Sequence, residues 1–300
     1  MNYKKIYYWS PSFVNIATNR AVINSSYSVS KYNHDFKASI INFFGEFTKY
    51  KSELNNKKIE TIGFFNPKII NFFPKHGKFN SRLSYLIIFI LSFFPLKNLI
   101  KKNNPEFLII HLITSLPLIL LILFNFKTKF ILRISGLPKM NLFRKLLWKI
   151  AFKKIYKVTC PTQSTFFYLK SLGIIPNEKL SLLYDPIINV SEINNKKKQF
   201  VPEKKNYFLA VGRLTKQKNF IFLCKAFKKI VDKNNDIILL IAGEGENKNI
   251  ILDYINRNNL KKNIFLLGHV ENIFPYFVNA KAFILTSLWE DPGFVLVEAG

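Results

Sequence analysis

Short apolar runs alternate along the chain with segments whose apolar residues recur at helical spacing. In the first part this pattern predicts strands at 5–9, 38–44, 107–112, 129–134 and 158–160, and helices at 17–31 and 142–155. In the second part it predicts strands at 207–211, 237–242, 264–267 and 282–288, and helices at 219–233, 249–258, 273–278 and from Phe294. Repeated β-α-β units of this kind form parallel sheets that helices cover on both faces.

A polar segment divides the two parts. The run NNKKKQF at 194–200, followed by Pro202, has the composition of an interdomain linker. A length of 300 residues also suits two domains. We therefore expect an α/β protein with an N-terminal domain at 1–195, a linker at 196–205 and a C-terminal domain at 206–300.

Two apolar stretches invite comparison with membrane spans. The segment 107–126 has no charged residue and is long enough to cross a bilayer. Polar residues and Pro117 in its first half instead favour a buried strand followed by a buried helix with Ser115 as N-cap. The stretch 83–96 is expected to be too short to span, because Pro95 should stop it.

The chain is strongly basic, with 45 Lys and Arg against 18 Asp and Glu, a net charge of +27 and a pI near 9.9. Such a charge indicates nucleic acid, an anionic membrane or a phosphate-bearing substrate as a neighbour. Helix 142–155 sets basic residues opposite an apolar stripe of Phe143, Leu146, Leu147, Ile150 and Ala151, which lies either on an anionic bilayer or on the core. No nucleic-acid-binding motif occurs, so nucleic acid is not the expected partner.

The cysteines and the N-terminal residues indicate the cellular compartment in which the protein is expected. Cys160 and Cys224 lie far apart without metal-binding spacing, which fits a reducing environment. The N-terminus lacks the apolar region of a secretory signal. We expect a cytoplasmic protein, free or peripherally attached to the inner face of the cytoplasmic membrane.

Charged and glycine-rich segments follow the strands of the second domain, where open α/β sheets bind ligands. Gly212 and Arg213 end its first strand, and Lys218 stands at the mouth of the next helix. The two cations can hold a diphosphate, or they simply belong to a basic surface. Gly243 and Glu244 in GEGE permit close backbone approach to a nucleoside base, or form a plain tight turn.

The end of the chain places two carboxylates around a helix start. Glu290 lies in a strand-to-helix loop, and Glu298 lies about one turn into the helix, facing back toward that loop. Gly293 and Phe294 begin this helix, whose free N–H groups favour an anionic or hydroxyl-rich ligand. Together these features suit a sugar nucleotide. Because no Asp-x-Asp pair occurs, we expect no metal cofactor, and protein cations and helix dipoles would stabilise a leaving diphosphate.

Four segments in fixed order resemble the donor domain of glycosyltransferase family 4: VGRLTKQKNF, IAGEGE, IFLLGHVEN and SLWEDPGFVLVEAG. Glu290 and Glu298 match the E-x7-E signature of that family. The resemblance implies the GT-B fold, with two Rossmann-like domains, and transfer of a hexose-type sugar with retention of configuration. The implied donor is a UDP or GDP sugar, and the implied acceptor is a glycan or lipid-linked saccharide in the synthesis of a bacterial surface polysaccharide such as lipopolysaccharide or capsule.

The resemblance also implies roles for single residues. Arg213 and Lys218 would neutralise the diphosphate, and Glu298 would accept hydrogen bonds from the ribose. Glu290 would hold the sugar hydroxyls, together with the backbone N–H groups of the two residues that begin the last helix.

Candidates in the first domain are fewer. The family often has a functional histidine after an N-domain strand, so His111 either contacts the donor sugar or is a buried, satisfied core residue. Ser10, Ser12 and Asn15 lie in the loop where the family has a Gly-Gly pair that is missing here, and are candidate sugar or acceptor contacts. Arg133, at the end of a strand, is a further candidate for the same role.

The sequence departs from the family at its end, since Gly300 falls inside the last predicted helix. We therefore expect a C-terminally incomplete second domain. A noncatalytic fragment that binds a nucleotide sugar, and a basic nucleic-acid-binding protein, are the alternative functions.

Overall fold

The structure is a computed structural model that describes residues 3–12, 17–66, 78–290 and 293–300. The chain divides into two compact units, Met1–Pro186 and Ile187–Gly300. The expected linker 196–205 belongs to the second unit, because Asn272 donates from Nδ2 to the Lys196 carbonyl (2.9 Å) and to Gln199 Oε1 (2.8 Å). The boundary thus falls earlier than the polar composition indicates.

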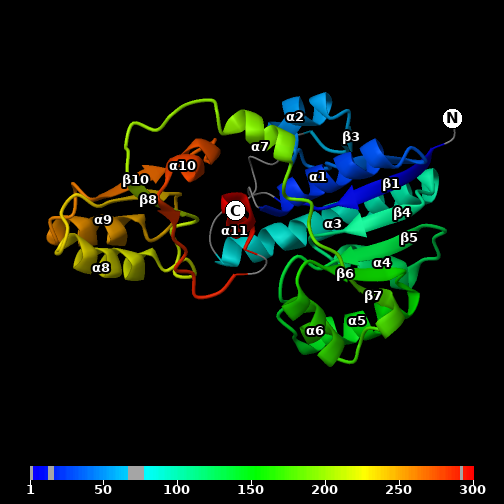
Figure 1. Cartoon of the computed structure of the whole chain (residues 1–300). Coiled ribbons are helices and arrows are strands. Elements are labelled where there is room, and N and C mark those ends of the chain that lie inside the picture. Colours follow the sequence, from blue (N-terminus) through cyan, green and yellow to red (C-terminus); the bar gives the residue numbers. More distant parts are fainter. Residues whose placement is uncertain (1–2, 13–16, 67–77, 291–292) are drawn as a thin grey trace. The chain divides into compact units, whose positions relative to one another are not determined.

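A seven-stranded, fully parallel sheet forms the centre of the first unit, with strand order β3-β2-β1-β4-β5-β6-β7 (Figure 1). Its strands are β1 (Lys4–Trp9), β2 (Phe36–Ile41), β3 (Glu60–Ile62), β4 (Phe107–Ile110), β5 (Lys129–Arg133), β6 (Lys157–Cys160) and β7 (Leu180–Leu182). All carboxyl ends therefore lie at one edge of this sheet. The five predicted strands are present within a few residues of their expected bounds, whereas the short β3 and β7 were not predicted.

Helices cover both faces of this sheet (Figure 1). They are α1 (Ala17–Tyr32), α2 (Lys51–Asn56), α3 (Lys78–Asn103), α4 (Ser115–Leu123), α5 (Leu142–Lys154) and α6 (Gln163–Ser171). α1 and α2 pack on one face, around Tyr8 and Ile40. α3, α4, α5 and α6 pack on the other, around Trp9, Ile110 and Leu132.

The segment 107–126 forms a strand and a helix, as predicted. β4 and α4 are joined by a short loop, and Leu116, Leu118 and Leu120 of α4 are completely buried. Thr114, not Ser115, is the residue before the first helical turn. The segment is apolar because both of its parts lie inside the fold.

The prediction for 83–96 was wrong, because α3 continues through Pro95 to Asn103. A proline inside a helix removes one hydrogen bond and costs about 3 kcal/mol. Here burial compensates: Ile88, Leu96 and Ile100 all belong to the core. By length and composition, Arg82–Asn103 could cross a membrane: its mean hydropathy is 1.9, and 28% of its most apolar window is buried inside the fold.

The second unit has a four-stranded parallel sheet of order β10-β9-β8-β11. Its elements are α7 (Val190–Lys196), β8 (Tyr207–Val211), α8 (Phe220–Val231), β9 (Ile238–Ala242), α9 (Lys248–Arg257), β10 (Ile264–Gly268), α10 (Phe274–Asn279), β11 (Ala282–Phe283) and α11 (Phe294–Ala299). α8 and α9 cover one face and α10 packs on the other. The predicted strand 282–288 is wrong beyond Phe283, because the chain there turns into a loop that hydrogen-bonds to the loop after β8.

Each unit buries one cysteine. Cys160 on β6 and Cys224 on α8 are both inaccessible to solvent, and neither forms a disulfide. Burial raises the pKa of the Cys224 thiol to about 12, so it stays protonated at neutral pH. Such a thiol is a poor nucleophile.

The loops after β8 and β9 touch backbone to backbone. A Cβ atom on Gly243 would lie 1.9 Å from the Gly212 carbonyl oxygen, and one on Gly245 would lie 2.5 Å from that of Leu214. Two backbone hydrogen bonds join the same segments: Gly212 to Ala242 (2.9 Å) and Leu214 to Glu244 (2.9 Å). Only glycine permits this approach, so the GEG sequence fixes the two loops against each other.

We predict that Gly243→Ala destabilises the second unit severely. The new Cβ must displace backbone at a positive φ, which we expect to cost about 3 kcal/mol or more of unfolding free energy. Gly268→Ala is the matched control: φ is also positive there, but its Cβ would meet only the flexible Glu244 carboxylate. We expect about 1–2 kcal/mol for that variant. Urea denaturation followed by circular dichroism measures both, and equal losses would contradict the close-approach argument.

Candidate functional site

The carboxyl edge of the second sheet gathers most of the residues that the sequence singled out. β8 ends at Val211, directly before Gly212 and Arg213, and β9 ends at Ala242, directly before Gly243 and Glu244. The strands are parallel, so these segments share one edge. This is the edge at which open α/β sheets bind their ligands.

An ion pair between distant parts of the sequence lies beside this edge. Lys218 donates from Nζ to Glu290 Oε1 at 2.5 Å, and the two side chains are only 12% and 18% exposed. Partial burial strengthens the attraction but also carries a desolvation cost, so such a pair is a weak source of stability by itself. What it does is hold a cation and a carboxylate in one fixed geometry.

Two glycines make room for this pair. A Cβ on Gly212 would lie 3.1 Å from Lys218 Cε, and one on Gly293 would lie 3.1 Å from Glu290 Cβ. Gly293 also has a φ of 72°, which favours glycine, and it stands directly before Phe294, the first residue of α11. The structure therefore brings together Gly212, Lys218, Glu290 and Gly293.

The loop after β11 rests on the loop after β8 through polar contacts. Leu288 donates its N–H to the Gln217 carbonyl (2.8 Å), and Gln217 Nε2 donates to the Trp289 carbonyl (2.9 Å). Thr286 Oγ1 donates to the Lys218 carbonyl (3.1 Å). Sequence reasoning missed Gln217 and Thr286, whose role depends on contacts across some seventy residues of chain.

Arg213 and Glu298 are not part of the ion pair between Lys218 and Glu290. The Arg213 side chain is exposed, and within the described part of the chain no acidic group forms an ion pair with it. Its guanidinium is thus available to a ligand. Glu298 is half-buried on α11, about one turn beyond Gly293. Its expected contact with a ribose stays a prediction.

The glycines of GEGE are explained by the protein itself. The close approach at Gly243 is made to the Gly212 backbone. Glu244 forms an exposed ion pair with Lys248 at 2.9 Å on the first turn of α9. A role for Gly243 and Glu244 in donor binding therefore stays a prediction.

A row of buried polar side chains crosses the carboxyl edge of the first sheet. The register pairs Trp9 with Ile110 and Ile110 with Leu132. The next residue of each strand is therefore also aligned: Ser10, His111 and Arg133. All three are buried, and the register puts their side chains on one sheet face.

Several polar atoms of this row have no hydrogen-bond partner among the described residues: Ser10 Oγ, His111 Nδ1 and Nε2, and Arg133 Nη1. Buried polar atoms are rarely left so, because each costs about 1–3 kcal/mol. Burial, with a smaller contribution from the Arg133 charge, lowers the pKa of His111 to about 3, so the ring is neutral at physiological pH. His111 is thus buried without a hydrogen-bond partner among the described residues, and whether it contacts a sugar stays a prediction.

The backbone just after His111 is strained. Ile113 has a φ of 45°, which is unfavourable for a β-branched residue. Its carbonyl accepts a long hydrogen bond from Trp9 Nε1 (3.5 Å). Strain of this kind clusters at ligand-binding sites.

Arg133 is held by a partner that the sequence analysis did not identify. Its Nε and Nη2 both donate to Asp185 Oδ1, at 3.1 and 2.7 Å, and the two side chains are 4% and 6% exposed. Asp185 thus occupies two of the three guanidinium nitrogens, and only Nη1 has no partner among the described residues, so a sugar or acceptor contact of Arg133 stays a prediction. Asp185 is followed by Pro186, which restricts the backbone at Asp185, but this signal does not indicate which side chain Asp185 contacts.

The remaining first-unit candidates are less defined. Ser12 is half-buried beyond β1, and Asn15 lies outside the described residues. Sequence reasoning missed Glu46, a buried carboxyl after β2 that accepts a hydrogen bond from the Phe44 N–H (2.8 Å). Burial raises the pKa of Glu46 to about 7. Glu46 stands out as the one acidic residue in the apolar run NFFGEF, although that pattern does not predict its burial.

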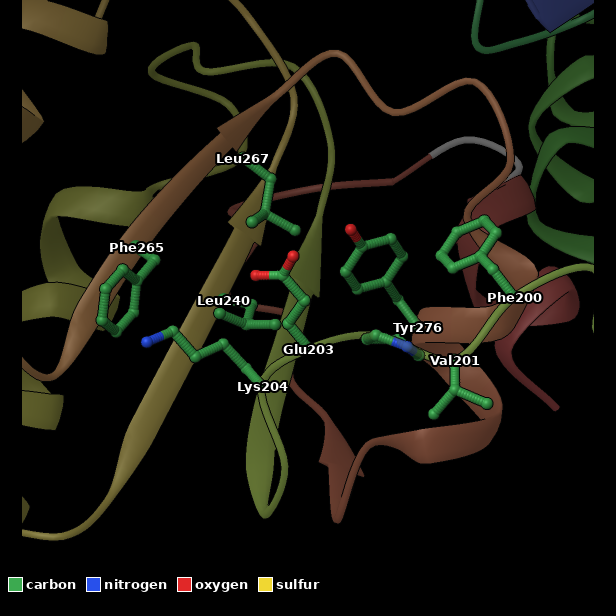
Figure 2. Close-up of a pocket in the computed structure, with 9 residues that line it drawn as sticks. Phe200, Val201, Glu203, Lys204, Leu240, Phe265, Leu267 and Tyr276 are labelled. Carbon is green, nitrogen blue, oxygen red and sulfur yellow. The ribbon is translucent and has the colours of Figure 1, made fainter.

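A cavity of about 390 Å³ lies elsewhere in the second unit. It is lined by Phe200, Val201, Pro202, Glu203, Lys204, Leu240, Phe265, Leu267 and Tyr276. Figure 2 shows the Tyr276 hydroxyl and the Glu203 carboxylate pointing into it, and the Lys204 ammonium lies 4.4 Å from the Phe265 ring centroid. None of the predicted donor residues lines this cavity. Across the described ranges no group of three His, Cys, Asp or Glu side chains could hold a metal ion.

Residues 191–300 match the family Glycosyl transferases group 1. The uncharacterized glycosyltransferase MJ1059 of Methanocaldococcus jannaschii is 32% identical over 229 residues, which are 67% of this chain and 55% of that protein. UDP-Gal:alpha-D-GlcNAc-diphosphoundecaprenol alpha-1,3-galactosyltransferase of Escherichia coli is 33% identical over 133 residues, 43% of this chain and 34% of the relative. The chain thus spans about half or less of the length of these relatives.

The fold resembles solved glycosyltransferase structures. A mutant of S. aureus TarM, in complex with Fondaparinux, alpha-GlcNAc-glycerol and UDP, superposes with a TM-score of 0.68 at 14% identity. The match covers 99% of this chain and 83% of that one. The chain therefore has an α/β fold of the GT-B type, and its residues 191–300 form a glycosyltransferase group 1 domain.

Proposed function

We propose that this protein is a glycosyltransferase that moves a hexose-type sugar from a nucleoside-diphosphate sugar to a glycan or lipid-linked acceptor with retention of configuration. The observation that carries the proposal is the partly buried ion pair between Lys218 and Glu290, against which Gly212 and Gly293 pack closely. The UDP in the TarM complex and the UDP-galactose substrate of the E. coli relative favour UDP over GDP as the donor nucleotide. The same relative's diphosphoundecaprenol substrate supports a role in bacterial surface polysaccharide synthesis.

Lys218 and Arg213 are assigned to the diphosphate. Glu290 holds Lys218 in position before the ligand binds, so the ammonium needs no reorganisation. The exposed Arg213 guanidinium is assigned a second positive contact with the diphosphate. Glu290 keeps a second carboxylate oxygen for a sugar hydroxyl, next to the N–H groups at Gly293 and Phe294. Glu298 is assigned to the ribose.

No protein nucleophile is needed in this scheme. The bond between the anomeric carbon and the diphosphate oxygen breaks, and the acceptor oxygen forms the new bond on the same face. The acceptor proton passes to the departing diphosphate. The two cations lower the energy of this step because negative charge builds up on the diphosphate as the bond breaks.

In the first unit, His111 is assigned to a sugar hydroxyl as a neutral hydrogen-bonding group. Ser12, Asn15 and the free Nη1 of Arg133 are assigned to sugar or acceptor hydroxyls. We place the protein in the cytoplasm, where nucleotide sugars are made. A noncatalytic protein that only binds the nucleotide sugar would share the donor site but transfer nothing.

We predict that UDP binding depends on the two cations. Lys218→Ala and Arg213→Ala should each weaken UDP affinity about 10- to 100-fold, the equivalent of about 1.5–3 kcal/mol for a lost charged hydrogen bond. Lys216→Ala is the matched control, because this exposed lysine lies in the same loop and takes no part in the ion pair between Lys218 and Glu290. Isothermal titration calorimetry measures all four proteins. Unchanged binding by both the Lys218 and Arg213 variants would remove the pair from the donor site.

We also predict how His111 couples stability to pH. Because its pKa falls from 6.5 in the unfolded chain to about 3 in the folded one, its contribution is complete above pH 6.5 and is lost as pH falls toward 3. Relative to His111→Asn, the wild type should lose about 1.4 kcal/mol per pH unit between pH 6 and 4. Urea unfolding at several pH values tests this. A difference that does not change with pH would mean that the folded ring accepts a proton.

A further inference from the structure

The cavity in the second unit lies on the sheet face that α10 covers, and the proposed donor site does not use it. Three parts of the chain build it: residues 200–204 ahead of β8, the faces of β9 and β10, and α10. The register pairs Phe265 with Leu240, and Leu267 follows two residues later, so these three side chains lie on one side of the sheet. A volume of about 390 Å³ is in the range of small-molecule sites.

Contacts between the walls hold this cavity open. The rings of Phe200 and Tyr276 meet edge to face with their centroids 5.7 Å apart, and the Tyr276 carbonyl accepts a hydrogen bond from the Tyr207 hydroxyl at 2.8 Å. Asn272, just before α10, donates to the Lys196 carbonyl and to Gln199, which fixes the segment that leads to residues 200–204. A ligand therefore finds the walls in place and loses little affinity to ordering them.

The cavity contains a carboxylate without a partner. Figure 2 shows the Glu203 carboxylate directed between Leu240, Leu267 and Tyr276. In the part of the chain that the structure describes, no cation forms an ion pair with Glu203, although the sequence has 45 Lys and Arg against 18 Asp and Glu. A negative charge held at an apolar cavity attracts a ligand of the opposite charge.

The chain itself places a cation against an aromatic wall of the cavity. The Lys204 ammonium lies 4.4 Å from the Phe265 ring centroid and points toward that ring (Figure 2). The negative face of an aromatic ring attracts cations, and Phe200 and Tyr276 supply further rings around the same space. Because Lys204 is exposed, its flexible side chain can turn into solvent and leave the Phe265 ring to another cation.

Other occupants fit these groups less well. An anionic ligand such as a nucleotide would bring its charge toward Glu203. An uncharged apolar ligand would gain nothing from the carboxylate. A second copy of the chain would bring together two molecules that each carry a net charge of +27.

We propose that this cavity binds a small organic cation, an ammonium group with an apolar or aromatic substituent. The ammonium lies between the Glu203 carboxylate and the Phe265 ring, where it displaces Lys204. The substituent packs against Leu240, Leu267 and the Tyr276 ring. The site is separate from Lys218 and Glu290, so this inference goes beyond sugar transfer and does not depend on it.

Titration of the full chain with benzyltrimethylammonium, followed by two-dimensional amide NMR, tests the proposal. We expect saturable shifts at residues 200–204 and in β10, with a dissociation constant of about 1 mM or lower. Benzyl alcohol, which has the ring without the charge, should bind at least about threefold more weakly. Phenylacetate, which has the opposite charge, should not bind.

Substitutions at the cavity should change the affinity in opposite directions. Glu203→Gln should weaken binding of benzyltrimethylammonium about three- to fivefold, because it removes the charge partner. Phe265→Leu should weaken it about two- to fivefold, because the wall stays apolar but loses its ring. Lys204→Gln should instead strengthen binding about two- to fivefold, because the competing internal cation is gone.

Asp253→Asn is the matched control, since this exposed acid lies on α9, which covers the other face of the sheet, and binding should not change. Circular dichroism verifies the fold of each variant. Absence of saturable shifts, preference for phenylacetate, or unchanged binding by Glu203→Gln would overturn the proposal. So would weaker binding by Lys204→Gln.

A dimer in analytical ultracentrifugation that Phe265→Leu converts to a monomer would assign the cavity to a second copy of the chain and would likewise overturn the proposal. UDP binding is measured on the same variants. Loss of UDP binding with retained binding of the organic cation would count against the proposed function alone, so the two failures are distinguishable.

Discussion

The backbone contact between Gly243 and Gly212 is the constraint on which the second unit's edge depends. It fixes the loop after β8 against the loop after β9, and nothing larger than hydrogen fits between them. Once Gly212 is fixed, the aliphatic part of Lys218 packs against it, and the ammonium meets Glu290. Four residues far apart in sequence thus acquire one geometry from a contact that contains no side chain at all.

The two sheet edges treat polar groups in opposite ways. In the second unit, Lys218 is neutralised by Glu290 and retained in place. In the first, Ser10, His111 and part of Arg133 are buried with polar atoms that no described residue satisfies. The first arrangement is a preformed ion pair, whereas the second carries a desolvation cost that, under the proposed function, hydrogen bonds from a hydroxyl-rich ligand would offset.

Sequence patterns predicted what local periodicity controls. β8 has its expected bounds, and the strands and helices around it differ by a residue or two. The pattern failed where distant contacts decide. Pro95 does not end α3, because core packing outweighs the lost hydrogen bond, and the strand expected at 282–288 stops where Thr286 turns to Lys218.

The same limit applies to the sites. The spacing of Gly212, Lys218, Glu290 and Gly293 predicted one cluster, because parallel strands bring their ends together. Asp185 could not be predicted as the partner of Arg133, since no periodic signal links residues so far apart. Burial of Glu46 likewise depends on how its loop folds back, which composition does not encode.

The two buried thiols allow the opening of each half of the chain to be followed separately. Cys160 lies in the first unit and Cys224 in the second, and neither reaches solvent while its surroundings stay folded. An alkylating reagent therefore modifies each sulfur only during an opening event of that half. Peptide mapping of the label separates the two rates, so the local stability of either half can be followed without introducing a dye or removing a native residue.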